Sequence, residues 1–267
     1  MERNKHRIAL IYEGISVEDK LLKNMAENFF LKNVEIEFFS FPAEGNIYML
    51  WSKLKEDDYE TNVIDVIKEM SKETKKRLDD VDLHASSFSE IYLFFDYDGH
   101  NNNIPKEYLG QDVLGELLRC FNNETEMGKL YISYPMVEAI KEISFKQAEY
   151  NRLYVPLEEI HAYKHSFESR MDYGKYDKYD VKMWKVACRA SVRQAGLIIQ
   201  YNASCTYEQF IHDFGQEAIY KAQKEHYIRA NHMLAILNSI PLFLMEYLDE
   251  SICGGYIEPN EMQPAVE

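Results

Sequence analysis

The sequence predicts an α/β protein in which a mainly parallel, doubly wound sheet is followed by an α-helical C-terminal region. Short apolar segments alternate with helical patterns from residue 7 to about residue 142, as they do in such sheets. Two of these segments, 8–12 and 91–95, contain only aliphatic and aromatic residues, which is typical of strands buried on both faces. After about residue 150 the alternation fades, and longer helical patterns take its place.

The first half of the alternation starts with the strand 8–12, which Glu13-Gly14 ends. Ser16, with Asp19 three residues later, has the pattern of a helix N-cap. The elements expected after this strand are, in order, a helix from Ser16, a strand over 34–41 that Pro42 ends, and helices over 46–56 and 61–78.

The second half starts with the strand 91–95, which ends abruptly in Asp96-Tyr97-Asp98-Gly99. The elements expected after it are a helix over 110–122, a strand over 130–133, and two long amphipathic helices over 181–200 and 215–248, the second kinked at Pro241. We therefore expect a sheet domain over residues 1–145 and a helical region over 146–267 that serves dimerisation or partner docking.

Composition narrows the classes of partner and compartment. A net charge of −15 over 267 residues argues against a protein that coats nucleic acid through a general basic surface. The four Cys are widely separated and form no C-x-x-C pair, so neither a zinc site nor a disulfide framework is expected. No apolar stretch reaches the roughly 20 residues that cross a bilayer, and no signal peptide is recognised. We expect a cytoplasmic protein with no membrane partner.

Acidic residues follow two of the predicted strands. Glu13 comes directly after the first strand, and Asp96 and Asp98 follow the strand 91–95. Functional groups collect beyond the carboxyl ends of strands in open parallel sheets, and residues two apart in an extended segment point the same way. An isolated Asp-x-Asp-Gly is also ordinary turn chemistry. Acids at both strand ends, however, favour a shared Mg²⁺ or Mn²⁺ site.

These two motifs resemble those of the Toprim family, in which a Glu-Gly follows the first strand and an Asp-x-Asp follows a later one. The matching residues are Ile-Tyr-Glu13-Gly14 and Leu-Phe-Phe-Asp96-Tyr97-Asp98-Gly99, and the resemblance covers roughly residues 7–145. The chain is also similar to the small Toprim proteins encoded beside an ATPase in bacterial phage-defence pairs, namely the AriB-like subunit of PARIS and the AbiL-type abortive-infection proteins. The segments 133–138 and 238–244 carry that narrower likeness.

The resemblance implies a Toprim catalytic domain and a metal-dependent nuclease that acts as a toxic effector in anti-phage defence with an ATPase partner. Its substrate would be RNA, with tRNA among the candidates, or DNA. Glu13 would be the catalytic acid/base or a metal ligand, and Asp96 and Asp98 would be ligands of Mg²⁺ or Mn²⁺. Glu138 either completes this cluster or is a solvated helix glutamate.

Four further residues are candidates for nucleic-acid binding. His100 follows Asp98 by two residues, and Lys164 lies between two histidines. Lys185 and Arg189 belong to a basic stripe at helical spacing. Each has an ordinary alternative, because loop histidines and solvated charged helix faces are common.

Two other functions and one assembly remain open from the sequence. The chain could be a non-catalytic docking module of an ATPase complex, or a phosphatase in which Asp96 is the nucleophile. It carries no P-loop and no G-x-S-x-G elbow of its own. The apolar residues near Phe243 either pack on their own domain or bury in a second copy, which would make a homodimer.

Overall fold

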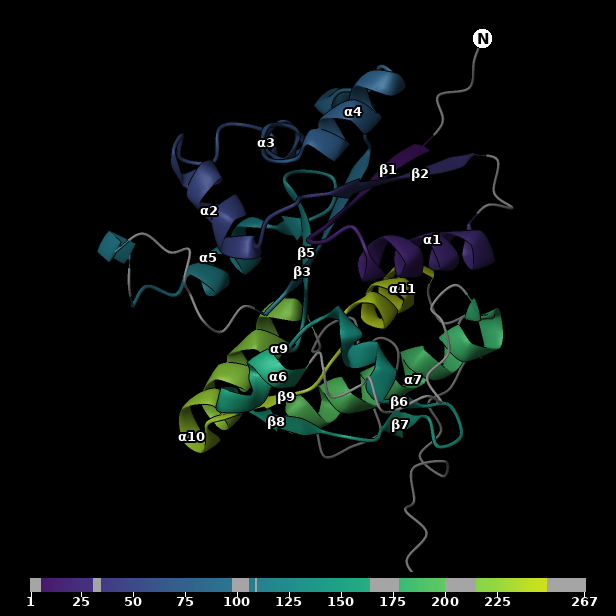
Figure 1. The fold of residues 1–267 in the computed structure, drawn as a ribbon, viewed down its shortest axis with the longest axis vertical. Helices are drawn as coiled ribbons and strands as arrows, with labels where there is room; N and C mark the ends of the chain where they lie inside the picture. The colour runs from purple at the N-terminus through teal and green to yellow at the C-terminus, as the bar shows by residue number, and fades with distance from the viewer. Residues whose placement is uncertain are drawn as a thin grey trace, which may run out of the picture. The chain divides into compact units, whose positions relative to one another are not determined.

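The computed structural model describes residues 6–30, 35–97, 106–108, 110–163, 178–199 and 215–248. They fall into two compact units (Figure 1). The first runs to Val137 and includes a short segment that ends at Tyr179, and the second comprises the rest of the chain. The division after Val137 lies upstream of the boundary at residue 145 that the sequence suggested.

A five-stranded, mostly parallel sheet forms the centre of the first unit, which agrees with the predicted α/β class. Its order is β2-β1-β3-β5-β4. Only β4 runs antiparallel, against β5. The strands are β1 (His6–Tyr12), β2 (Ile36–Pro42), β3 (Glu90–Asp96), β4 (Asn122–Asn123) and β5 (Gly128–Ser133).

Helices connect the parallel strands across both faces of this sheet. Helix α1 (Val17–Phe29) lies on one face, and the helices between β2 and β3 lie on the other (Figure 1). These are α2 (Ile47–Lys55), α3 (Val63–Met70) and α4 (Lys72–Asp80). The 3₁₀ turn η1 (Ala85–Ser87) precedes β3, and the 3₁₀ turn η2 (Lys106–Tyr108) and α5 (Val113–Cys120) follow it. The predicted burial of β1 is confirmed, because each residue from Ile8 to Tyr12 is at most 1% exposed.

The prediction of a single helix over 61–78 is wrong. Ser71 has extended backbone (φ −115°, ψ 119°) and separates α3 from α4. Its hydroxyl accepts the Thr74 N–H at 3.0 Å, so Ser71 is the N-cap of α4. Ser71 is neither a glycine nor a proline, and the polar residues 72–77 are ordinary helix formers, so the sequence pattern gave no sign of the break.

Glu116 of α5 ties this helix to α2 and the residues after it. Its Oε1 accepts hydrogen bonds from Lys55 Nζ at 3.1 Å and from the Tyr59 hydroxyl at 2.8 Å. Burial alone would raise the pKa of Glu116, but the hydrogen bonds from Tyr59 and Lys55 outweigh it and lower that pKa. The carboxylate is therefore the form that stabilises the fold.

From these two hydrogen bonds we predict that Glu116→Gln loses stability in a pH-dependent way. The pKa of Glu116 is lower in the folded than in the unfolded chain. Its contribution to the free energy of unfolding is therefore complete above about pH 4.3 and disappears as the pH falls through the folded-state pKa. We expect the variant to lose about 1 kcal/mol of unfolding free energy at pH 7 and to approach wild-type stability in acid. Urea unfolding at pH 7 and at pH 3 measures both, and a loss of equal size at the two pH values would contradict the argument.

The second unit contains two short antiparallel strand pairs and several helices. Strand β6 (Ile143–Ser144) pairs with β7 (Glu149–Tyr150), and β8 (Tyr154–Pro156) pairs with β9 (Met233–Ala235). Its helices are η3 (Val137–Glu142), η4 (Leu157–Glu159), α6 (Ile160–Tyr163), α7 (Val181–Ile198), α9 (Gln216–Ala222), the π-helical η7 (Gln223–Ile228), α10 (Arg229–Asn231) and α11 (Ile240–Leu248).

The prediction of a single kinked helix over 215–248 is also wrong. The chain leaves the helical path at His232, whose φ of +52° is left-handed, and then forms β9. Pro241 is the second residue of α11, where its missing N–H breaks no intrahelical bond. Helix α11 packs against α7 of the same unit, and Phe243 is fully buried there. Phe243 and Leu244 are therefore buried within the chain, whereas pairing with a second copy stays a prediction.

None of the helices in the described ranges is long and apolar enough to cross a membrane.

Candidate functional site

The candidate site lies where the strand order of the sheet reverses. From β1 the chain passes through α1 to β2 on one side, and from β2 it returns through α2 to α4 to β3 on the other side of β1. The connections that leave β1 and β3 therefore diverge. In open parallel sheets, ligands bind in the crevice outside the carboxyl ends of the strands at this kind of point.

Glu13 and Asp96 meet at this position. Glu13 follows the last residue of β1, and Asp96 is the last residue of β3. One carboxylate oxygen of Glu13, Oε2, accepts the backbone N–H of Asp96 at 3.2 Å. Two acids that are 83 residues apart in the sequence are thus brought together, while their roles as ligands stay a prediction.

Asp96 also contacts the segment that follows β5. Its Oδ1 accepts the backbone N–H of Val137 at 2.8 Å, and the next residue, Tyr97, donates its N–H to Ser133 O at 2.9 Å. Residues that follow β1 and β5 therefore both contact Asp96, Glu13 through its backbone N–H and Val137 through its carboxylate. A backbone hydrogen bond fixes the direction of a side chain without neutralising its charge.

A tyrosine pair lies beside Asp96. The ring of Tyr134 is 5.5 Å from the ring of Tyr97, and Tyr134 is fully buried. Burial first, and then the neighbouring Tyr97 and Tyr48, raise the pKa of Tyr134 well above its usual value. Its hydroxyl has no hydrogen-bond partner among the described residues. Tyr134 is therefore neutral at every ordinary pH.

The backbone of the β1–α1 turn is held by its neighbours. Tyr12 O accepts the Ala43 N–H at 2.7 Å, and Glu13 O accepts the Glu44 N–H at 3.1 Å. The Gly14 N–H donates to Glu18 Oε1 at 3.2 Å, and Glu18 is only 7% exposed. Glu18 thus has a structural partner inside the turn that presents Glu13.

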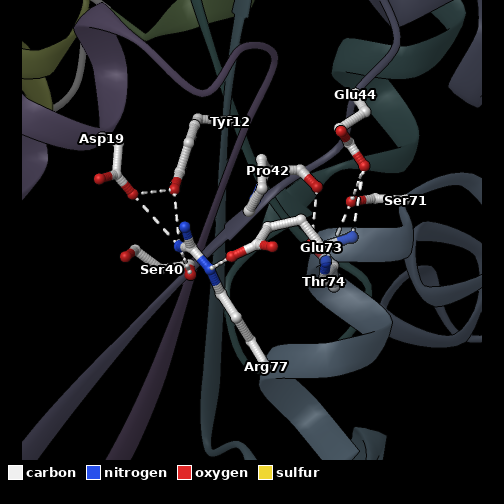
Figure 2. A network of polar contacts seen from close by, with 9 residues as sticks. All are labelled: Tyr12, Asp19, Ser40, Pro42, Glu44, Ser71, Glu73, Thr74 and Arg77. Carbon is white, nitrogen blue, oxygen red and sulfur yellow. Dashed lines mark hydrogen bonds and ion pairs between the residues drawn. The ribbon is translucent and has the colours of Figure 1, made fainter.

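A polar network links Tyr12, at the end of β1, to Asp19 and Arg77 (Figure 2). The Tyr12 hydroxyl donates to Asp19 Oδ1, and Arg77 Nη1 donates to the Tyr12 hydroxyl at 3.0 Å and to Asp19 Oδ1 at 3.2 Å. Burial, reinforced by Asp19, raises the pKa of Tyr12, so its hydroxyl stays protonated. Sequence reasoning missed Arg77, because no local pattern relates a residue of α4 to the end of β1.

The oxygen atoms of this site are of the type that hard divalent cations bind. Glu13 and Asp96 offer carboxylate oxygens, and a carboxylate has about four lone-pair positions, so one backbone hydrogen bond is compatible with coordination. Within the part of the chain that the structure describes, no group of three or more His, Cys, Asp or Glu is placed to hold a metal ion. Asp98, the third predicted ligand, lies outside that part.

The remaining predicted site residues are placed as follows. Glu138 belongs to the second unit, where it lies in η3 and is 2% exposed. It is therefore not the solvated glutamate of the alternative interpretation, and its role as a ligand stays a prediction. Lys185 and Arg189 are partly exposed residues of α7 in the same unit. His100 and Lys164 lie outside the described residues.

No protein-family model matches the chain, and comparisons with curated proteins and with solved structures give no match either.

Proposed function

We propose that this chain is a metal-dependent nuclease of the Toprim type, which cleaves phosphodiester bonds in RNA or DNA. The observation that carries the proposal is the contact of Glu13 Oε2 with the Asp96 N–H, 3.2 Å apart, at the point where the strand order reverses. An acid after the first strand and an acid after the third meet at one edge of a parallel sheet, as the Toprim resemblance requires.

Each acid has a defined task in this proposal. Glu13 and Asp96 would hold a divalent ion together with Asp98, and Glu13 would also accept the proton of the attacking water. A bound Mg²⁺ or Mn²⁺ supplies the positive charge that stabilises the phosphoryl transition state and lowers the pKa of water. The Val137 N–H orients the Asp96 carboxylate, and the Asp96 N–H orients Glu13.

A nucleic acid must approach a strongly acidic chain, which carries a net charge of −15. The basic stripe on α7 that contains Lys185 and Arg189 is our candidate for contacting phosphates. An ATPase partner and a role as a defence effector in the cytoplasm follow from the resemblance and belong to the same proposal.

Metal-dependent cleavage by the purified chain tests this function. We expect labelled tRNA, single-stranded RNA or duplex DNA to be cut with Mg²⁺ or Mn²⁺, and cutting to stop when EDTA removes the metal. Asp96→Asn should lose about 10²-fold or more in rate, because a ligand charge is removed.

Two results would contradict the proposal. One is a folded wild-type chain that cuts none of these substrates with either metal. The other is cleavage that continues in EDTA. The first of these results would favour the docking-module alternative, in which the chain acts by binding an ATPase.

A further inference from the structure

Helix α4 and its N-cap hold the β1–α1 turn at two places, and the first is reached through Glu44, which follows β2. The Glu44 N–H donates to Glu13 O at 3.1 Å, and Glu44 itself has a left-handed φ of +52°, which is uncommon for a residue other than glycine. Its carboxylate accepts the Ser71 hydroxyl at 2.8 Å and the Glu73 N–H at 3.4 Å (Figure 2). The start of α4 thereby fixes the residue that binds the Glu13 carbonyl.

The second place is Arg77, one turn further along α4. Besides its bonds to Tyr12 and Asp19, Arg77 Nη1 donates to Ser40 O at 2.8 Å, and its Nε donates to Glu73 Oε1 at 2.9 Å (Figure 2). Tyr12 immediately precedes Glu13, and Asp19 lies in the first turn of α1. One guanidinium therefore binds both ends of the turn that carries Glu13.

We propose that Arg77 and Glu44 are positioning residues that keep the Glu13 carboxylate on the Asp96 N–H. The two are linked, because Glu73 donates its N–H to Glu44 and accepts from Arg77 Nε. Arginine suits this place because its planar group carries five N–H donors in a fixed geometry, which a lysine cannot match. The hydrogen bonds that hold the turn are read from the geometry alone, whereas the effect of Arg77 and Glu44 on catalysis rests on the proposed function.

Hydrogen exchange of the turn tests the positioning directly. In Arg77→Gln we expect the amides of residues 14–16 to exchange about 10-fold faster, since local opening sets that rate, while the amides of β3 stay at the wild-type rate. Arg7→Gln is the matched control, because Arg7 Nε binds Glu37 Oε2 at 3.2 Å at the opposite end of β1 and β2. An unchanged rate in the turn, or equal acceleration in every peptide, would overturn the proposal.

Kinetics and metal titration test the consequence for the site. Arg77→Gln should lower kcat by about 10- to 100-fold with little change in KM, because the acid is misplaced rather than lost, and should weaken Mn²⁺ binding. Arg77→Lys should recover part of both values. If Arg77→Gln does not fold, Tyr12→Phe removes only the hydroxyl that Arg77 and Asp19 share, and the same loosening and loss are expected.

The outcomes separate the two proposals. Suppose that the wild-type chain cuts nothing, while the amides of the turn exchange faster in Arg77→Gln. That result would refute the nuclease proposal and support the positioning of the turn. Suppose instead that the wild-type chain cuts nucleic acid and that a folded Arg77→Gln keeps its full kcat and Mn²⁺ affinity. That result would refute the positioning role and support the nuclease proposal.

Discussion

Glu13→Gln is expected to reduce metal-dependent cleavage by about 10²- to 10⁴-fold, the range found when a general acid or base is removed. Glutamine has nearly the same shape, and its amide oxygen can still accept the Asp96 N–H that Glu13 Oε2 accepts at 3.2 Å. It has no negative charge for a metal ion and cannot take a proton. Initial rates at saturating Mn²⁺ measure the effect.

The same variant should keep or slightly gain stability. Glu13 and Asp96 carry like charges at one edge of the sheet, so removing one charge relieves repulsion. Glu90→Gln is a suitable control, because Glu90 begins the strand that Asp96 ends and binds His6 at that far end. Wild-type cleavage by a folded Glu13→Gln protein would remove Glu13 from the mechanism, whereas equal losses in both variants would point to the fold instead.

Gly128→Ala should cost about 2–4 kcal/mol of unfolding free energy, from left-handed strain and overpacking together. Gly128 has a φ of +116° at the start of β5. A Cβ there would lie 2.7 Å from Leu93 Cδ1, 3.2 Å from Ile91 Cγ2 and 3.3 Å from Ile91 O. These atoms belong to β3, the central strand that ends in Asp96, and the strand backbone cannot move aside cheaply.

Gly110→Ala separates the two causes. Gly110 also has a positive φ, +88°, but a Cβ there would meet nothing within 4 Å. This control should lose only about 1 kcal/mol, the cost of the conformation alone. Urea unfolding of both variants gives the comparison. Equal losses would show that the contacts with Leu93 and Ile91 contribute nothing.

The sheet could be predicted because its strands carry a strong local signal. The runs 8–12 and 91–95 are wholly apolar and aromatic, and both became buried parallel strands. A strand that is covered on both faces has no polar side to maintain. Burial of this kind leaves a readable pattern in the sequence, and the order of the elements in the first unit follows from it.

The ends of the helices were harder to predict. Ser71 separates α3 from α4, and His232 ends the helical path before β9. Neither residue is a glycine or a proline, the residues that most often mark a break in a helical pattern. A backbone change that depends on one side-chain cap or one left-handed residue leaves no trace in the hydrophobic period.

The candidate site was predictable in part for the same reasons. Glu13 and Asp96 stand directly after recognisable strands, so their meeting follows from the parallel order of β1 and β3. Arg77 lies 65 residues from Tyr12 and 58 from Asp19 in the sequence. Tyr12 also resembles an ordinary core residue. Contacts between side chains of distant elements follow from the tertiary structure and not from local pattern.

The most direct test of the central claim is the position of a bound metal ion. A crystal of the protein soaked in Mn²⁺ should show an anomalous peak that is about 2.0–2.6 Å from carboxylate oxygens of both Glu13 and Asp96. The peak should be absent from crystals of Glu13→Gln prepared in the same way. A peak that touches neither carboxylate, or no peak at a Mn²⁺ concentration that supports cleavage, would contradict the account.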